Sequence, residues 1–214
     1  MRVLGIIPAR GGSKRCPRKN IADLGGRPLI DWTIQAAVES DVFTALLVST
    51  EDKEIAQVAE SCGCSVWDRP PHLARDDTPS LDVVMDVVMA HGVGHFDVIH
   101  LLQPTSPFRA ASDIGDAHDM LTRSGGDAVV SVIDLPQDNV FEVGHAWRMR
   151  PRPSLVVPNG AIYAITGDAL SRGEDWYSGV TYAYKMPRER SLDIDTPLDL
   201  EVARLMMVRG LVAA

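Results

Sequence analysis

The chain has 214 residues, of which 45% are apolar, so it is long enough to bury the core of one domain spanning residues 1–214. Its formal net charge of −8 argues against a protein that binds nucleic acid through bulk charge. No apolar run is long enough to cross a bilayer, and the N-terminal residues lack a signal-peptide pattern. The cysteines, Cys16, Cys62 and Cys64, include no second pair for a zinc site, so we expect reduced thiols in a cytoplasmic protein.

Short apolar runs alternate with segments of helical period along the first part of the chain. We predict strands at residues 3–9, 45–50, 65–68, 97–105 and 127–135, and helices at 28–40, 52–63, 80–92 and 111–126. Pro28 suits a first helical turn and Gly63 a helix end, and either Thr78 or Ser80 suits the N-cap of the third helix. The alternation predicts an α/β fold with a mostly parallel sheet and helices on both faces.

Residues 136–158 interrupt this alternation with polar and proline-rich sequence, and we interpret them as an excursion from the sheet. After the excursion we predict strands at 160–166 and 182–187 and a final helix at 196–210. Thr196, Pro197 and Asp199 form a good helix start, because they supply a cap, a first-turn proline and a capping-box acid.

Basic residues are concentrated near the N-terminus of this acidic chain. Residues 1–27 hold seven basic residues and one acid, so their local charge is +6, while the remainder carries −14. Five cations follow the first strand, around Gly11 and Gly12: Arg10, Lys14, Arg15, Arg18 and Lys19. Ligands of open α/β sheets lie beyond the carboxyl ends of strands, where glycine N–H groups and basic side chains can bind anions. The pattern predicts a site for a nucleoside triphosphate; a basic surface loop without a ligand is the alternative.

A pair of acids offers the second half of a triphosphate site. Asp193 and Asp195 stand two residues apart on a segment predicted to be extended, so their side chains point the same way. Two carboxylates together with phosphate oxygens and water suit Mg²⁺, whereas the alternative for Asp195 is a turn residue before the last helix. The motifs G-x-x-x-x-G-K-[ST] and G-x-G-x-x-G are both missing after the first strand, so neither a P-loop nor a dinucleotide site is indicated.

Five segments of the chain occur in the order seen in the acylneuraminate cytidylyltransferases (CMP-sialic acid synthetases). They are IIPARGGSKRCPRKN (6–20), RPPHLARDDTPS (69–80), LLQPTSPFR (101–109), PNGAIYA (158–164) and SLDIDTPLDL (191–200). The chain resembles this family over nearly its whole length, and the octulosonate cytidylyltransferases more distantly. The resemblance implies a Rossmann-like nucleotidyltransferase fold, and a reaction in which CTP and a 2-keto-3-deoxy acid sugar give the CMP-sugar and pyrophosphate.

The resemblance also assigns roles to individual residues. It implies that Arg10, Ser13, Lys14 and Lys19 hold the triphosphate beside Gly11 and Gly12, that Asn20, Arg69 and Ser80 contact the nucleotide, and that Asp193 and Asp195 bind Mg²⁺. For the acceptor pocket it implies Gln103, Asn159, Tyr163, Trp176 and Tyr177. Arg10, Lys14, Lys19 and Asp195 are expected to act in catalysis, with Asp195 either a metal ligand alone or the general base as well.

Simpler structural roles are the alternatives for several of these residues. Ser80 would only cap a helix, Gln103 would only satisfy loop backbone groups, and Tyr163 and Trp176 would only be core residues.

The acceptor half of the resemblance departs from the family pattern. The segment of residues 136–158 is shorter than the corresponding segment in typical members of the family. In those enzymes the segment supplies dimer contacts and part of the sugar site of the neighbouring subunit. Val157 stands where many relatives carry Arg. As a separate point, the candidates for the arginine that would pair the acceptor's carboxylate are Arg148, Arg150 and Arg152.

We therefore predict a Mg²⁺-dependent cytidylyltransferase that acts on CTP and an acidic sugar of the nonulosonic class. We expect a cytoplasmic homodimer without nucleic-acid or membrane partners, with residues 136–158 as a small dimerisation excursion. One alternative is an enzyme of the same fold with another acceptor: an octulosonate, an aminosugar phosphate or a phosphonate. The other is a non-catalytic nucleotide-binding protein, against which the presence of both Asp193 and Asp195 argues.

Overall fold

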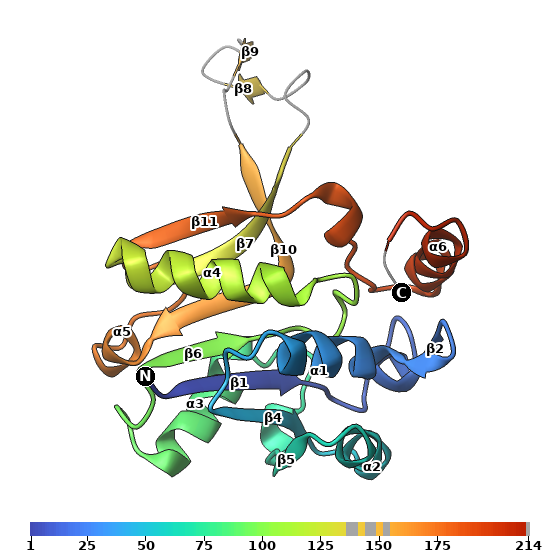
Figure 1. Cartoon of the computed structure of the whole chain (residues 1–214), viewed down its shortest axis with the longest axis horizontal. Coiled ribbons are helices and arrows are strands. Elements are labelled where there is room, and N and C mark those ends of the chain that lie inside the picture. Colours follow the sequence, from blue (N-terminus) through green and yellow to red (C-terminus); the bar gives the residue numbers. More distant parts are fainter. Residues whose placement is uncertain (136–140, 144–148, 152–154, 213–214) are drawn as a thin grey trace.

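The computed structural model describes residues 1–135, 141–143, 149–151 and 155–212. Its centre is a seven-stranded sheet in the spatial order β11 (Thr181–Lys185), β7 (Ala128–Asp134), β10 (Val156–Thr166), β6 (Val98–Leu101), β1 (Val3–Pro8), β4 (Ala45–Thr50) and β5 (Ser65–Asp68) (Figure 1). Neighbouring strands are parallel except at β10, which runs antiparallel to both β6 and β7. The prediction of a mostly parallel sheet is confirmed.

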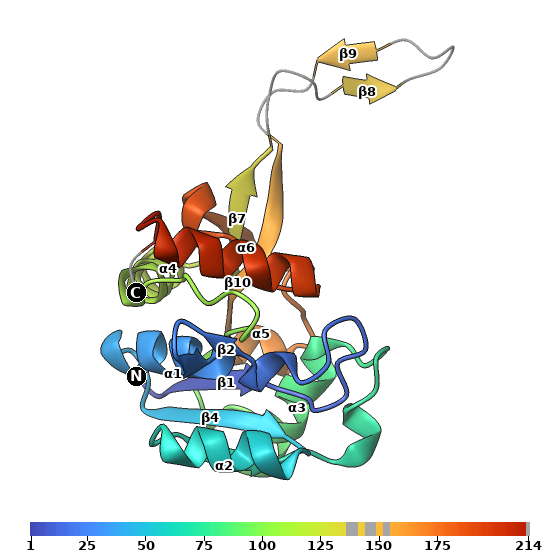
Figure 2. The same ribbon diagram turned by 90° about the vertical axis from the view of Figure 1, so that its right-hand side faces the viewer.

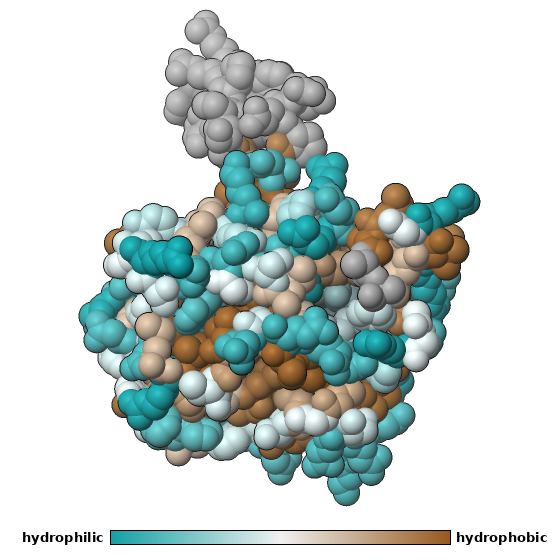
Figure 3. Space-filling model, viewed as in Figure 1, coloured by the Kyte–Doolittle hydropathy of each residue, from teal (hydrophilic) through white to brown (hydrophobic). Residues whose placement is uncertain are grey.

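Helices cover both faces of the sheet, as predicted. One face carries α1 (Leu29–Glu39), α2 (Lys53–Ser61) and α4 (Ala111–Ser124), and the other carries α3 (Ser80–His91) and the short α5 (Gly167–Ser171) (Figure 1). Among the described residues, no helix combines the length and the apolar character that crossing a membrane requires. In the space-filling view, hydrophilic residues cover most of the α1 and α4 face, and hydrophobic ones show in its middle (Figure 3).

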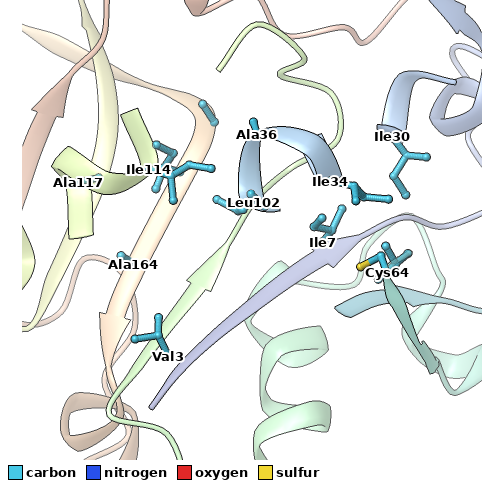
Figure 4. Packing of buried hydrophobic residues seen from close by; sticks show 14 of the residues in the cluster. Val3, Ile7, Ile30, Ile34, Ala36, Cys64, Leu102, Ile114, Ala117 and Ala164 are labelled. Atoms are coloured by element: carbon cyan, nitrogen blue, oxygen red, sulfur yellow. The ribbon is translucent and has the colours of Figure 1, made fainter. Parts of the chain in front are cut away.

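Strand β1 illustrates how a period of two fills the core on both faces. Val3 and Ile7 pack with residues of α1 and α4 in one apolar cluster (Figure 4). Leu4 and Ile6 point the other way and join residues of α3 in a second cluster. Fully burying each such side chain stabilises the fold by about 1.5–3 kcal/mol. Because the side chains on both faces of β1 are buried, the pairing register of β1 with its neighbouring strands is fixed. The position at which the following loop begins is therefore fixed as well.

A third apolar cluster fixes the C-terminal helix α6 (Pro197–Val208). Leu200 and Ala203 of α6 pack on Leu24 and Leu29, beside the two-stranded sheet of β2 (Asp23–Leu24) and β3 (Arg27–Pro28). The Thr196 side chain caps α6 in a capping box with Asp199, which confirms the predicted helix start. The segment that precedes α6 is thereby held against the loop that follows β1.

Some predicted boundaries were wrong for identifiable reasons. Helix α3 begins at Ser80 with Pro79 in the N-cap position, so neither Thr78 nor Ser80 caps it. Strand β6 ends at Leu101 rather than at residue 105, and Pro104, which lacks an N–H, could not have extended the ladder. The helix α5 and three short 3₁₀ helices, η1 (Lys19–Ile21), η2 (Pro71–Leu73) and η5 (Arg188–Arg190), were not predicted.

The predicted excursion contains a hairpin of two short strands. Strands β8 (Phe141–Val143) and β9 (Met149–Pro151) pair in antiparallel fashion beyond the ends of β7 and β10, away from the helix-covered sheet (Figures 1 and 2). Of the candidate arginines, Arg150 lies in β9, whereas Arg148 and Arg152 lie outside the described residues.

Candidate functional site

A cleft of about 610 Å³ opens at the edge of the sheet where the parallel strands β1, β5 and β6 end. Its walls come from the loop after β1, the segment between β5 and α3, the residues after β6 and the extended segment before α6. Predicted site residues that line it are Arg10, Ser13, Lys14, Lys19, Asn20, Arg69, Ser80, Gln103, Asp193 and Asp195. Arg15, another cation of the predicted basic loop, also lines it. Lining residues not singled out as site residues from sequence include Cys16, Arg75, Asp76, Thr78 and Thr105. The predicted nucleotide and metal residues are therefore brought together by the fold.

The basic loop (residues 10–19) is fastened to the turn between β4 and α2. The Gly11 N–H donates to Oε1 of Glu51 at 2.8 Å, and a Cβ at Gly11 would collide with the Asp52 carboxylate. Arg18, in the left-handed region at φ 59°, pairs with Asp52 at 2.7 Å and with Glu54. Gly11 and Arg18 thus anchor the loop, whereas a Cβ at Gly12 would meet open space.

The four other cations of the basic loop face two carboxylates of the cleft. Asp76 forms ion pairs with Arg10 and with Lys14. Hydrogen bonds from these two side chains hold the pKa of Asp76 below its usual range. On the other side of the cleft, Asp195 accepts from Arg15 at 2.9 Å and from Lys19 at 3.1 Å. The cations that suit a polyphosphate are therefore gathered on both sides of one cleft.

Asp193 and Asp195 point into the cleft because the chain alternates around Ile194. The Ile194 side chain is fully buried in the α6 cluster, and its N–H donates to the Thr105 carbonyl at 2.8 Å. Desolvation is the main cause that raises the pKa of Asp193, and the charge of Asp195 raises it further, against a hydrogen bond with Thr105. Two neighbouring carboxylates, one of them destabilised in its charged form, form an oxygen site that a hard divalent cation would relieve.

Asp193 and Asp195 by themselves supply only part of the coordination shell of a metal ion. In the part of the chain that the structure describes, no group of three or more His, Cys, Asp and Glu side chains gathers as a metal site. A cation on Asp193 and Asp195 would complete its coordination with phosphate oxygens and water, which is the usual binding mode of Mg²⁺.

Buried polar residues support the nucleotide side of the cleft. Arg69, only 4% exposed, donates from Nε to the Ser49 hydroxyl at 3.1 Å and from Nη2 to the Ser49 carbonyl at 2.6 Å. Burial lowers the pKa of Arg69, and the charge of Glu51 opposes that shift. Asn20 is buried and donates to the Arg10 carbonyl at 3.0 Å, which braces the basic loop from below.

Asn159 lies behind the cleft and is not among the described residues that line it. Its Oδ1 accepts from the Ser131 hydroxyl at 2.6 Å and from the Ala161 N–H at 3.1 Å. Its Nδ2 donates to the Ser191 hydroxyl at 2.8 Å. The side chain predicted to contact the acceptor therefore ties β7 and β10 to the segment that carries Asp193.

Two of the predicted aromatic residues, Tyr163 of β10 and Trp176 after α5, pack in the apolar cluster on the α3 side of the sheet, and among the described residues that line the cleft none is Tyr163, Trp176 or Tyr177. The rings of Tyr163 and Trp176 lie 5.6 Å apart between centroids, with Trp176 buried and Tyr177 59% exposed. Burial is the main cause that raises the pKa of Tyr163, and the neighbouring Tyr177 and Asp193 raise it further. Asp193 thus lies close to both the cleft and the aromatic group.

Arg109 supports the site but was not predicted as a site residue. It is 2% exposed and donates to the Ala161 carbonyl at 2.7 Å, the Thr33 hydroxyl at 2.9 Å and the Gln103 carbonyl at 3.3 Å. Burial lowers its pKa to about 9, although the charge of Asp113 opposes the shift. Arg109 lies in a segment that the family resemblance covers, but no local pattern distinguishes a buried arginine from a surface one.

Comparisons with known proteins show which family and fold the chain is similar to. A family model described as cytidylyltransferase matches residues 4–144. CMP-N,N'-diacetyllegionaminic acid synthase of Legionella pneumophila is 35% identical, over 97% of this chain and 97% of its own length. N-acylneuraminate cytidylyltransferase A of Danio rerio is 34% identical over 97% of this chain. The alignment covers 51% of the Danio protein, so this chain spans about half the length of that curated relative.

Solved structures share the fold at low sequence identity. CMP:2-keto-3-deoxy-manno-octonic acid synthetase complexed with CTP superposes with a TM-score of 0.74 at 18% identity, over 98% of this chain and 100% of that one. 4-Diphosphocytidyl-2C-methyl-D-erythritol synthase of Anaerococcus prevotii gives a TM-score of 0.69 at 10% identity, over 97% and 99% of the two chains. Both likenesses support the predicted Rossmann-like nucleotidyltransferase fold.

Proposed function

Because this chain belongs to the cytidylyltransferase family, we propose that it joins CTP to an acidic 2-keto-3-deoxy sugar of the nonulosonic, sialic-acid-like class. The products are the CMP-sugar and pyrophosphate. The observation that carries the proposal is one cleft that is lined both by the cations Arg10, Lys14 and Lys19 and by the carboxylates Asp193 and Asp195. The 35% identity to a CMP-sugar synthase over nearly the full length of both chains supports it.

In the proposed reaction the acceptor hydroxyl oxygen attacks the α-phosphorus of CTP. A new bond forms between that oxygen and phosphorus as the hydroxyl gives its proton to a base, for which Asp195 is the candidate. The bond from the α-phosphorus to the oxygen that bridges it to the β-phosphate breaks, and pyrophosphate leaves with the bonding electrons. Arg10, Lys14 and Lys19 stabilise the charge that grows on the leaving group. Such preorganised cations act mainly on the transition state, because the charge there exceeds that of the bound substrate.

Mg²⁺ is the cofactor we propose for the carboxylate pair. Asp193 and Asp195 would hold it, since their oxygens are hard ligands and the charge on Asp193 is destabilised by burial. When bound, the ion would neutralise phosphate charge and help to orient the α-phosphate. Release of Asp195 from Arg15 and Lys19 would accompany this binding, and both cations then become available to phosphate oxygens.

The acceptor would occupy the side of the cleft nearest the aromatic group. Gln103 lines the cleft, and its Oε1 lies 2.7 Å from where a Cβ would stand at Gly160, whose positive φ of 79° in any case disfavours a residue with a side chain. Tyr163, Trp176 and Tyr177 would flank the sugar beyond it. The identity of the sugar, a cytoplasmic location and the homodimer remain predictions; the free thiols of Cys16, Cys62 and Cys64 are consistent with a reducing compartment.

Pyrophosphate release from CTP with a panel of acceptors tests the proposal. We expect Mg²⁺-dependent release with a nonulosonic acid and little with an octulosonate, an aminosugar phosphate or a phosphonate. Asp193→Asn and Asp195→Asn should each abolish turnover, whereas Asp77→Asn, a matched charge change on the exposed rim, should not. CTP binding without pyrophosphate release from any acceptor would instead identify a non-catalytic nucleotide-binding protein.

A further inference from the structure

Asp76 has no part in the reaction described above, yet it contacts two residues that do. It follows η2 in the segment that leads to α3, and it lines the cleft. Its carboxylate forms ion pairs with both Arg10 and Lys14, and the Asp76 side chain is 39% exposed. A carboxylate in this position is unexpected in a site for a polyanion, because it repels the ligand that the cations attract.

The neighbouring acid is placed differently, which makes Asp76 distinctive. Asp77 pairs with Arg75 at 3.3 Å, and its side chain is 73% exposed. It forms no ion pair with the basic loop in the described part of the chain. Two adjacent acids of equal charge therefore differ mainly in whether they hold the cations assigned to the triphosphate.

A carboxylate and a phosphate compete for the same donors. Arginine and lysine bind either group through charge-assisted hydrogen bonds, and the N–H donors that face Asp76 cannot make full contacts with phosphate at the same time. A polyphosphate that binds Arg10 and Lys14 must therefore compete with Asp76 for these donors, at a cost in affinity.

We propose that Asp76 is an internal competitor for the triphosphate, which holds Arg10 and Lys14 at the cleft wall and weakens the binding of CTP and of pyrophosphate alike. The proposal rests on the proposed function for the identity of the ligand. Its consequence for turnover is faster release of pyrophosphate, because Asp76 takes back the two cations as the product leaves. The residue thus tunes affinity and product release rather than the chemical step.

The test compares Asp76→Asn with Asp77→Asn. Both substitutions remove one negative charge, and the two positions are adjacent in the chain. Isothermal titration with inorganic tripolyphosphate and with CTP should give about tenfold tighter binding for Asp76→Asn, from the loss of two competing ion pairs, and less than about twofold for Asp77→Asn. The difference should shrink at high salt, and the inhibition constant for pyrophosphate should fall in Asp76→Asn alone. Equal affinities in the two variants, or weaker binding in Asp76→Asn, would overturn the proposal.

A double-mutant cycle separates competition from a general charge effect. In a Lys14→Ala background, Asp76→Asn should tighten tripolyphosphate binding by less than in the wild type, because one of the two pairs is already absent. Full additivity would contradict direct competition.

Tripolyphosphate also separates this inference from the proposed function. Binding of tripolyphosphate with the expected Asp76 effect, but no pyrophosphate release from CTP, would refute the cytidylyltransferase function and keep the role of Asp76. A wild-type protein that binds neither CTP nor tripolyphosphate would refute both.

Discussion

Two adjacent cations of the basic loop, Arg18 and Lys19, have different roles, although both side chains carry a positive charge. Lys19 is 11% exposed at its side chain and lies in the cleft beside Asp195. Arg18, the next residue, reaches away to Asp52 and Glu54 at the start of α2. The first is placed to contact phosphate oxygens, and the second holds the loop in shape.

Substituting each of these two cations by alanine separates the tasks. Lys19→Ala should lower kcat on the order of 10²-fold, as is typical when one preorganised donor is removed from a charged transition state. Arg18→Ala should lower kcat by no more than about fivefold, since an exposed ion pair contributes ~0.2–1 kcal/mol. Steady-state kinetics with varied CTP measure both; a change in KM alone for Lys19→Ala would make it a ground-state binder.

At the scale of elements, the start of α6 controls the segment that bears the carboxylate pair. The Asp199 carboxylate accepts from the backbone N–H groups of Thr196 at 2.7 Å and of Asp195 at 3.1 Å. The Thr196 hydroxyl accepts in return from the Asp199 N–H at 3.3 Å. The helix cap and the Asp195 backbone are therefore one hydrogen-bonded unit.

Removing the cap should destabilise the protein by a predictable amount. Thr196→Ala should lower the free energy of unfolding by about 1 kcal/mol, because it leaves a helical N–H group without its partner. Thr196→Ser keeps the hydroxyl and should stay within about 0.5 kcal/mol of the wild type. Urea titrations of the three proteins measure this, and equal stability of the alanine and serine variants would show that the cap contributes nothing.

At the scale of the whole molecule, a buried histidine couples folding to pH. His100 on β6 is fully buried, with its Nε2 at 3.2 Å from Nδ1 of His118 and its ring 5.3 Å from that of Phe43. Burial, together with a smaller effect of the neighbouring His118, lowers the pKa of His100 to about 3. The unfolded chain, with a histidine pKa of about 6.5, binds this proton far more readily than the folded protein.

The free energy of unfolding should therefore fall as the pH drops from about 6.5 toward 3, by up to ~1.4 kcal/mol per pH unit from this group. His100→Gln should show a shallower slope between pH 6 and pH 4, whatever its stability at pH 7. Urea unfolding at several pH values gives both slopes. Parallel slopes for the two proteins would rule out His100 as a source of acid sensitivity.

The hairpin of β8 and β9 bears on assembly. It lies beyond the ends of β7 and β10, away from the helix-covered sheet (Figures 1 and 2). A two-stranded hairpin by itself is at best marginally stable in water, so we expect a second copy of the chain to pack on it.

Shortening the excursion tests the predicted homodimer. Replacing residues 137–153 by a short glycine–serine turn should convert a dimer to a monomer in sedimentation velocity, while the helix-covered sheet retains its circular dichroism spectrum. Acceptor KM should rise in the shortened protein and CTP binding should be spared. A wild-type protein that sediments as a fully active monomer would contradict this prediction.

Several features of this protein were determined by the sequence alone. Hydrophobic periodicity gave the order and type of most strands and helices, since burial on both faces of β1 or on one face of α4 requires that pattern. The alternation around Ile194 placed Asp193 and Asp195 on one side, and Thr196 with Asp199 marked the start of α6. The family resemblance, carried by five ordered segments, is confirmed by the family model and by the full-length relative.

Only the tertiary structure decided which distant groups meet. The antiparallel placement of β10 follows from its pairing with β7 across the excursion, where a parallel partner would have needed a crossover. Asn159 turns toward Ser131 and Ser191, and Arg18 turns to Asp52 while Lys19 turns to Asp195. Local sequence carries no record of these partners, because a polar side chain has the same propensities whether its hydrogen bonds are made within the core, on the surface or to a ligand. The choice is made when packing brings remote segments together and each buried polar group must find a partner.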